Sequence, residues 1–223
     1  MIAVVIDIET TGFSRKIDPT TGYLADGNEI LEVGYLRIDT DTRRIISYGS
    51  LYFYKPHFPI ENQAQSVHHL TREFLEAHEK DFDKNLIILN ALIQNTCIIG
   101  KNSDEFDIPF IEAFIKKYAR GVLDYRIAVA AAKINYYGTK TKFYYENTMW
   151  TQDVQSLFKR TFQDLHYAQT GELVSRPGTL SDYIDVLGYW DIVNKIYSGM
   201  KTERAGRAHC ALYDVVMTYA VWC

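Results

Sequence analysis

Apolar positions along the chain follow two patterns, short continuous or alternating runs and stripes at helical spacing. The runs, which are rich in Val, Ile and aromatic residues, predict strands at residues 2–6, 29–38, 44–54 and 97–100. The stripes predict helices at residues 71–78, 86–93, 107–119, 153–162, 179–187 and 210–222. Strands come first and helices then alternate with strands, so the order favours an α/β fold with helices packed on a mixed sheet.

The connections between these segments carry different turn signals. A polar link at residues 39–42 suits a hairpin between the second and third strands. Residues 13–28 contain a proline and two glycines, and they predict a long exposed loop.

Residues 122–147 have the least regular pattern. Their Lys- and Tyr-rich part, residues 133–145, fits either an inserted hairpin or a loop. Residues 122–124 and 148–153 could each supply the strand that precedes the next helix. We favour 148–153, because the helix then follows directly and 122–147 becomes an insertion into one domain that spans residues 1–223.

Length and composition limit the class of protein. With 223 residues, 47% of them hydrophobic, the chain can bury a full core, which excludes a disordered chain. The net charge of -4 provides no overall basic field. A nucleic-acid partner would therefore depend on a local basic strip or on bound metal.

The cysteines and the apolar runs indicate the compartment. Cys97, Cys210 and Cys223 form no CxxC pair and leave an odd number, which argues against a disulfide framework or a zinc knuckle. We therefore expect a reducing, cytoplasmic setting. No apolar stretch is long enough to span a membrane, and Asp7 interrupts the first apolar run, so we expect neither a membrane segment nor a signal peptide.

Two acidic residues at the end of the first run give the first indication of chemistry. Asp7 and Glu9 lie two residues apart in a predicted strand, so their side chains point to one face while Ile8 points to the other. Neighbouring carboxylates at the end of a buried strand repel each other and lose hydration. A divalent cation would make the arrangement favourable, and a complete metal site would need further carboxylates from elsewhere.

Two predicted helices supply candidate partners, although each acid alone has an ordinary explanation. Asp107 opens a helix, where a negative charge complements the helix dipole, and Asp214 alone would be a partly exposed helix acid. His209 lies five residues before Asp214, and five helical steps turn about 500°, which leaves the two side chains about 140° apart. The two side chains therefore do not share a helical face, and Gly206 indicates that His209 lies on the loop that enters the last helix.

Five segments, in order along nearly the whole chain, resemble motifs of the DEDDh family of 3′–5′ exonucleases, which is DnaQ-like and belongs to the ribonuclease H-like superfamily. The segments are DIETTG at 7–12, ILEVG at 30–34, VHHLT at 67–71, GKNSDEFD at 100–107 and HCALYD at 209–214. They are similar to the family's DxETTG, IIEIG, VHGIT, GHNxxFD and HRALxDA motifs. Lys101 stands where the family often has His, one extra residue precedes Phe106 as in bacterial exonuclease I, and Cys210 replaces the usual Arg.

The resemblance implies a ribonuclease H-like mixed five-stranded sheet flanked by helices. It implies an enzyme that hydrolyses phosphodiester bonds at single-stranded 3′ ends of DNA or RNA, releases nucleoside 5′-monophosphates and uses two Mg²⁺ or Mn²⁺ ions. In the family's mechanism Asp7 bridges both ions, and Glu9 and Asp214 bind the ion that carries the nucleophilic water. Asp107 supports the site, and His209 corresponds to the general base.

The resemblance also assigns residues to the substrate. Those expected to contact the terminal nucleotides are Thr10, Thr11, Gly12, Phe13, His68 and Asn102. No motif reports contacts to the 2′ position, so DNA and RNA both stay open. A homodimer and association with a polymerase or another nucleic-acid-processing complex are both compatible with the family.

Two other interpretations compete with the enzyme. The alternative function is a catalytically silent nucleic-acid-binding or scaffolding module on the same fold. Such modules usually lose one or more of the metal acids, whereas all four acids and His209 are present here. The third interpretation makes the acids unrelated caps and surface charges, and it requires five ordered motifs to coincide by chance.

Overall fold

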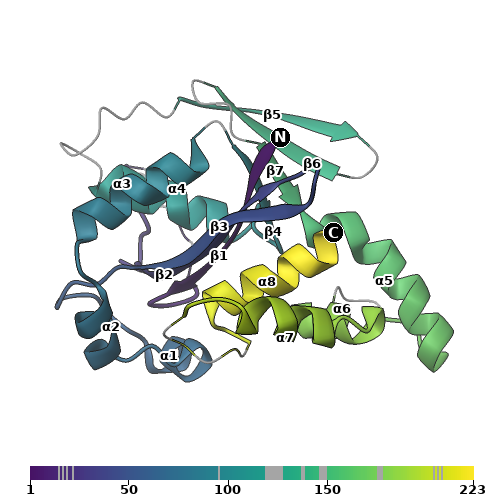
Figure 1. The fold of residues 1–223 in the computed structure, drawn as a ribbon. Helices are drawn as coiled ribbons and strands as arrows, with labels where there is room; N and C mark the ends of the chain where they lie inside the picture. Colours follow the sequence, from purple (N-terminus) through teal and green to yellow (C-terminus); the bar gives the residue numbers. More distant parts are fainter. Residues whose placement is uncertain are drawn as a thin grey trace.

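The computed structural model places the predicted strands in one five-stranded sheet (Figure 1). It describes residues 1–223 except 15, 17, 19, 22, 95, 119–127, 137–138, 146–149, 175–177, 203, 205 and 207, and it describes the backbone alone at 128–136, 139–145, 150–151 and 156. The strands, in their order across the sheet, are β3 Arg44–Tyr52, β2 Ile30–Asp39, β1 Ile2–Thr10, β4 Cys97–Gly100 and β7 Trp150–Asp153. β3, β2 and β1 pair antiparallel, whereas β1, β4 and β7 run parallel.

Helices cover both faces of this sheet (Figure 1), because the side chains of β1 alternate between two apolar cores. The helices are α1 Asn62–His68, α2 Arg72–His78, α3 Phe82–Ile93, α4 Asp107–Tyr118, α5 Val154–Thr170, α6 Leu180–Leu187, α7 Trp190–Ser198 and α8 Ala211–Trp222. Val4, Ile6 and Ile8 pack with residues of α2, α3 and α4, whereas Ala3 and Val5 pack with residues of α5 to α8. None of the described helices is long and apolar enough to cross a membrane.

The predicted mixed five-stranded sheet flanked by helices is confirmed. Of the two candidate last strands, Trp150–Asp153 joins the sheet beside β4, and α5 follows it directly. The other candidate, 122–124, lies outside the described residues. Within the predicted insertion, β5 Ala128–Tyr136 and β6 Thr139–Tyr145 pair antiparallel in a separate two-stranded sheet, which fits the hairpin and not the loop.

The sequence pattern does not predict two short helices, α1 and α7. The residues at their N-caps, Glu61 and Tyr189, make no capping hydrogen bond, so the usual start signal is missing. α5 also continues to Thr170, beyond the predicted end at residue 162. Its second half is mostly polar and partly or fully exposed, so it carries no apolar stripe that would mark a helix.

A glycine in β2 brings α8 against the sheet next to the first acidic residue. Gly34 pairs with Asp7 across β1 and β2. A side chain at Gly34 would overlap the backbone of Ala211 and Leu212, which form the first turn of α8. The missing side chain therefore lets the start of α8 lie directly on the strands, and this places Asp214 close to β1.

We expect Gly34→Ala to lower the free energy of unfolding by about 1–3 kcal/mol, since the added methyl group must push α8 off the sheet. Urea denaturation measures this loss. Gly199→Ala is the matched control, because its methyl group would meet only carbonyl oxygens at 3.4 Å or more, in a helical backbone conformation. A Gly34→Ala protein as stable as the wild type would show that α8 does not rest on this glycine.

Candidate functional site

A cavity of about 360 Å³ opens where the C-terminal end of β1 meets the first turns of α4 and α8. The sequence-assigned residues that line it are Asp7, Glu9, Thr10, Phe13, His68, Asn102, Asp107, His209 and Asp214. The other lining residues are Ile8, Val67, Lys101, Phe106, Ala208, Met217 and residues 179–181 at the start of α6. The fold therefore gathers into one cavity side chains that lie far apart in the sequence.

Two assigned residues, Thr11 and Gly12, do not line this cavity. The hydroxyl of Thr11 accepts a hydrogen bond from the Glu29 N–H at 2.9 Å, and the Thr11 N–H donates to the Glu29 carbonyl at 2.9 Å. A side chain at Gly12 would overlap neighbouring side chains. Both residues therefore shape the turn that presents Thr10 and Phe13, and their contact with substrate stays a prediction.

β1 directs two carboxylates to the cavity, and α4 adds a third. Asp7 and Glu9 face the cavity from β1, while Ile8 packs in the apolar core. The Ile8 N–H donates to Asp107 Oδ1 at 3.1 Å. This bond ties the first residue of α4 to the strand between the other two acids, so the three carboxylates are held together.

The turn before α4 is fixed by an acid from the end of the sheet. Asn102 has a left-handed backbone conformation (φ 58°), and its N–H donates to Asp153 Oδ1 at 2.9 Å. The same oxygen accepts from the Gln155 N–H at 2.9 Å, where Asp153 caps α5. Asp153 therefore links this turn to β7, a role that the sequence did not predict.

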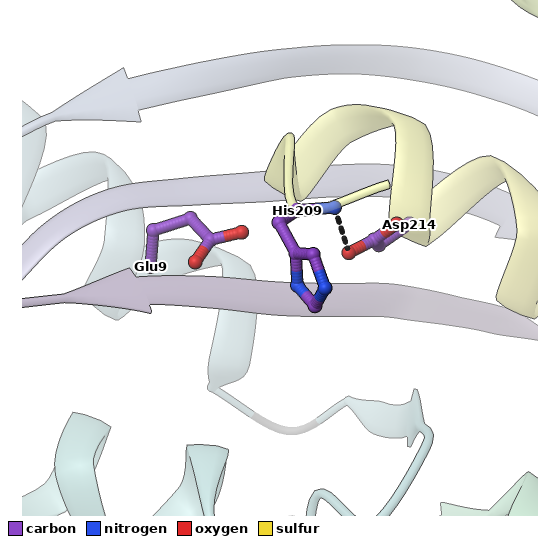
Figure 2. A group of neighbouring side chains, drawn as sticks. All are labelled: Glu9, His209 and Asp214. Carbon is purple, nitrogen blue, oxygen red and sulfur yellow. Dashed lines mark hydrogen bonds between the residues drawn. The ribbon is translucent and has the colours of Figure 1, made fainter. Parts of the chain in front are cut away.

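The start of α8 supplies the fourth carboxylate and an imidazole. Asp214 is buried, and its Oδ2 accepts from the His209 N–H at 3.0 Å (Figure 2). Its Oδ1 is buried without a hydrogen-bond partner among the described residues. His209 lies in the segment before α8, as predicted, and its side chain is exposed. One potential ligand atom each from Glu9, His209 and Asp214 lies within 4.8 Å of the other two.

Simultaneous ionisation of the four carboxyl groups is unfavourable. Burial raises the pKa values of Asp7 and Glu9 well above the ordinary carboxyl range, and repulsion from neighbouring acids raises them further. Burial also raises the pKa values of Asp107 and Asp214 to about 7. Divalent cations such as Mg²⁺ prefer carboxylate oxygens, so this donor set, with the unpartnered Oδ1 of Asp214, fits such a cation.

Both histidines at the cavity favour the neutral form. Burial, assisted by nearby positive charge, lowers the pKa of His209 below its usual value. Burial and then Arg204 lower the pKa of His68 to about 4. The Leu70 N–H donates to His68 Nδ1 at 2.9 Å, which assigns the ring proton of His68 to Nε2. His209 can therefore accept a proton, and His68 can donate a hydrogen bond.

A buried ion pair beside the cavity is not predicted by any sequence pattern. Glu32 in β2 is fully buried, and it pairs with Arg204 from the segment before α8. The only signal in the sequence is a single acidic residue within the apolar run ILEVG, because a carboxylate rarely stays buried without a partner. No pattern marks Arg204 as that partner.

A family model matches most of the chain. A sequence model of the family described as "Exonuclease" matches residues 4–169. This stretch contains Asp7, Glu9 and Asp107, whereas His209 and Asp214 lie beyond it. No curated protein matches the sequence.

Several solved structures are similar over nearly the whole chain. E. coli exonuclease I in complex with a dT13 oligonucleotide is 15% identical with a TM-score of 0.58, over 98% of this chain and 39% of that chain. The zinc-bound form of the E. coli exonuclease I–ssDNA complex is 17% identical with a TM-score of 0.53, over 98% and 39%. The product-bound structure of exonuclease I is 14% identical with a TM-score of 0.57, over 99% and 42%. This chain thus shares their fold and spans about two fifths of their length.

Proposed function

The chain belongs to the exonuclease family, and from this membership we propose that it removes nucleotides from single-stranded 3′ ends of DNA by metal-dependent hydrolysis. The observation that carries the proposal is the meeting of four carboxylates and a neutral imidazole in one cavity. The choice of single-stranded DNA draws on the exonuclease I complexes, whose fold this chain shares.

We assign the metal site to Asp7, Glu9, Asp107 and Asp214, with Mg²⁺ or Mn²⁺ as the expected ions. Oxygen ligands suit both ions, and the raised pKa values of these acids give a reason for the protein to bind positive charge there. When bound, two such ions would stabilise the charge that develops on the phosphate during hydrolysis.

The remaining groups have roles that follow from their positions. His209, neutral and exposed at the cavity, takes the proton of the attacking water, and the 3′ oxygen of the next nucleotide leaves as the new P–O bond forms. His68 offers its Nε2–H to an acceptor on the terminal nucleotide. Phe13, 46% exposed at the cavity, provides a ring on which a terminal base can stack.

The decisive experiment follows the shortening of 5′-labelled single- and double-stranded DNA and RNA, with Mg²⁺, with Mn²⁺ and with excess EDTA. We expect a ladder of products shortened from the 3′ end, fastest on single-stranded DNA, and none in EDTA. Cleavage that survives EDTA would remove the metal mechanism. Oligonucleotides that are bound but never shortened would favour the silent binding module, and faster shortening of RNA would correct the proposed substrate.

A further inference from the structure

A guanidinium lies almost completely buried beside the cavity. The side chain of Arg204 is 7% exposed, and its Nη1 donates to Glu32 Oε2. The other oxygen of Glu32 accepts from the Ser50 hydroxyl at 2.8 Å. Glu32 therefore has both oxygens engaged, and it fixes one edge of the guanidinium to β2.

The other edge of the guanidinium holds two backbone carbonyls at the cavity. Arg204 Nη2 donates to the carbonyl of His68, at the end of α1, and to the carbonyl of His209, at 3.3 Å. One planar group thus connects β2, the end of α1 and the segment that carries the proposed base. A lysine has a single ammonium group without this flat, two-edged geometry, so it could not maintain the three connections.

The backbone of His209 needs such support. Its φ of 61° lies in the left-handed region, which a residue other than glycine rarely adopts unless its surroundings hold it there. The N–H of His209 is held by Asp214 Oδ2, and its carbonyl is held by Arg204. The Arg204 bond is therefore one of the two described backbone hydrogen bonds that keep the imidazole at the cavity.

We propose that Arg204, held by Glu32, is a positioning residue that fixes the backbone of His209 and so places the imidazole for proton transfer. The proposal rests on the proposed function, since it assigns Arg204 a part in that reaction. Arg204 is not among the residues that line the cavity, and it acts through its bond to the His209 carbonyl.

The test is a double-mutant cycle between Arg204→Lys and His209→Ala on labelled single-stranded DNA. General bases contribute about 10²–10⁴-fold to rate, so partial loss of the imidazole's position should lower kcat of Arg204→Lys about 10- to 100-fold. The bond to the His68 carbonyl, which is lost as well, bears on substrate binding and therefore on KM, so the cycle is read in kcat. In the His209→Ala background we expect Arg204→Lys to lower kcat less than about 3-fold further, because the group that it positions is already gone.

The lysine keeps the positive charge, so a role in charge alone would leave kcat unaffected. Arg72→Lys is the matched control, because Arg72 also donates to two backbone carbonyls, but these belong to Pro56 and Phe58, which do not line the cavity. Equal loss of kcat in both His209 backgrounds would show general structural damage and overturn the proposal. If circular dichroism shows Arg204→Lys unfolded, Glu32→Gln takes its place, and a smaller loss with the same non-additivity is expected.

A readout without catalysis separates this proposal from the function on which it rests. The imidazole signal of His209, identified by its absence in His209→Ala, should shift or broaden in Arg204→Lys and stay unchanged in Arg72→Lys when metal-free protein is studied by NMR. A signal that is unchanged in Arg204→Lys would overturn the positioning role. A shifted signal in a protein whose wild type hydrolyses no oligonucleotide would instead refute the proposed function.

Discussion

Asp7→Asn is expected to lower the rate of hydrolysis of single-stranded DNA by at least about 1,000-fold, because metal ions supply several kcal/mol of transition-state stabilisation. Asp7 interacts electrostatically with each of the other three acids. After burial, the charges of Asp107, Asp214 and Glu9 each raise its pKa. Asparagine keeps the shape of the side chain and loses its charge. The measurement is kcat on a 5′-labelled oligonucleotide in saturating Mg²⁺ or Mn²⁺.

The same substitution should have the opposite effect on stability without metal. Folding raises the pKa of Asp7, so at pH 8, where the unfolded chain carries this carboxylate ionised, the group opposes folding in EDTA. Its replacement by asparagine should therefore stabilise the protein by about 1 kcal/mol, or about 2–4 °C in melting temperature. Added Mg²⁺ should stabilise the wild type more than the variant, since it binds the folded state. Asp164→Asn is the control, because Asp164 is exposed and its Arg160 partner lies 4.0 Å away. Full activity in Asp7→Asn would remove the metal site.

The family and the layout of the sheet could be predicted because they depend on local patterns. The predicted exonuclease family is confirmed by the match over residues 4–169, and the predicted fold by the observed strand order. Alternation along β1 correctly placed Asp7 and Glu9 on one face and Ile8 on the other.

The parts that escaped prediction depend on contacts between distant segments. Arg204 and Glu32 lie 172 residues apart in sequence, and neither has a spacing signal that names the other. Asp153 reaches Asn102 only because β7 pairs beside β4. Such pairs form where loops and strand ends meet in the folded chain. Local sequence patterns do not report which distant segments meet.

The carboxylates and the imidazole of the site are positioned in two different ways. The carboxylates come from strand and helix ends, whose positions follow from the sheet and from the close approach of α8 to Gly34. The imidazole comes from a backbone in a left-handed conformation, and its position depends on hydrogen bonds to Asp214 and Arg204. Metal binding and proton transfer should consequently be separable by mutation.

His209→Ala is the substitution that separates them. We expect a loss of about 10²–10⁴-fold in kcat, since the proton acceptor is removed, while Mn²⁺ affinity measured by calorimetry stays within a few-fold of the wild type. The four acids that we assign to the ions are all retained in this variant. His166→Ala is the control, because His166 is a partly exposed residue of α5 that does not line the cavity.

Calorimetry on this variant also decides between two roles for the imidazole. Potential ligand atoms of Glu9, His209 and Asp214 lie within 4.8 Å of one another, so the ring is close enough to the acids to bind an ion itself. A nitrogen bound to metal has its lone pair engaged and cannot accept a proton from water. If metal affinity falls together with kcat in His209→Ala, the imidazole is a metal ligand. If metal affinity is retained while kcat falls, the imidazole is the proton acceptor.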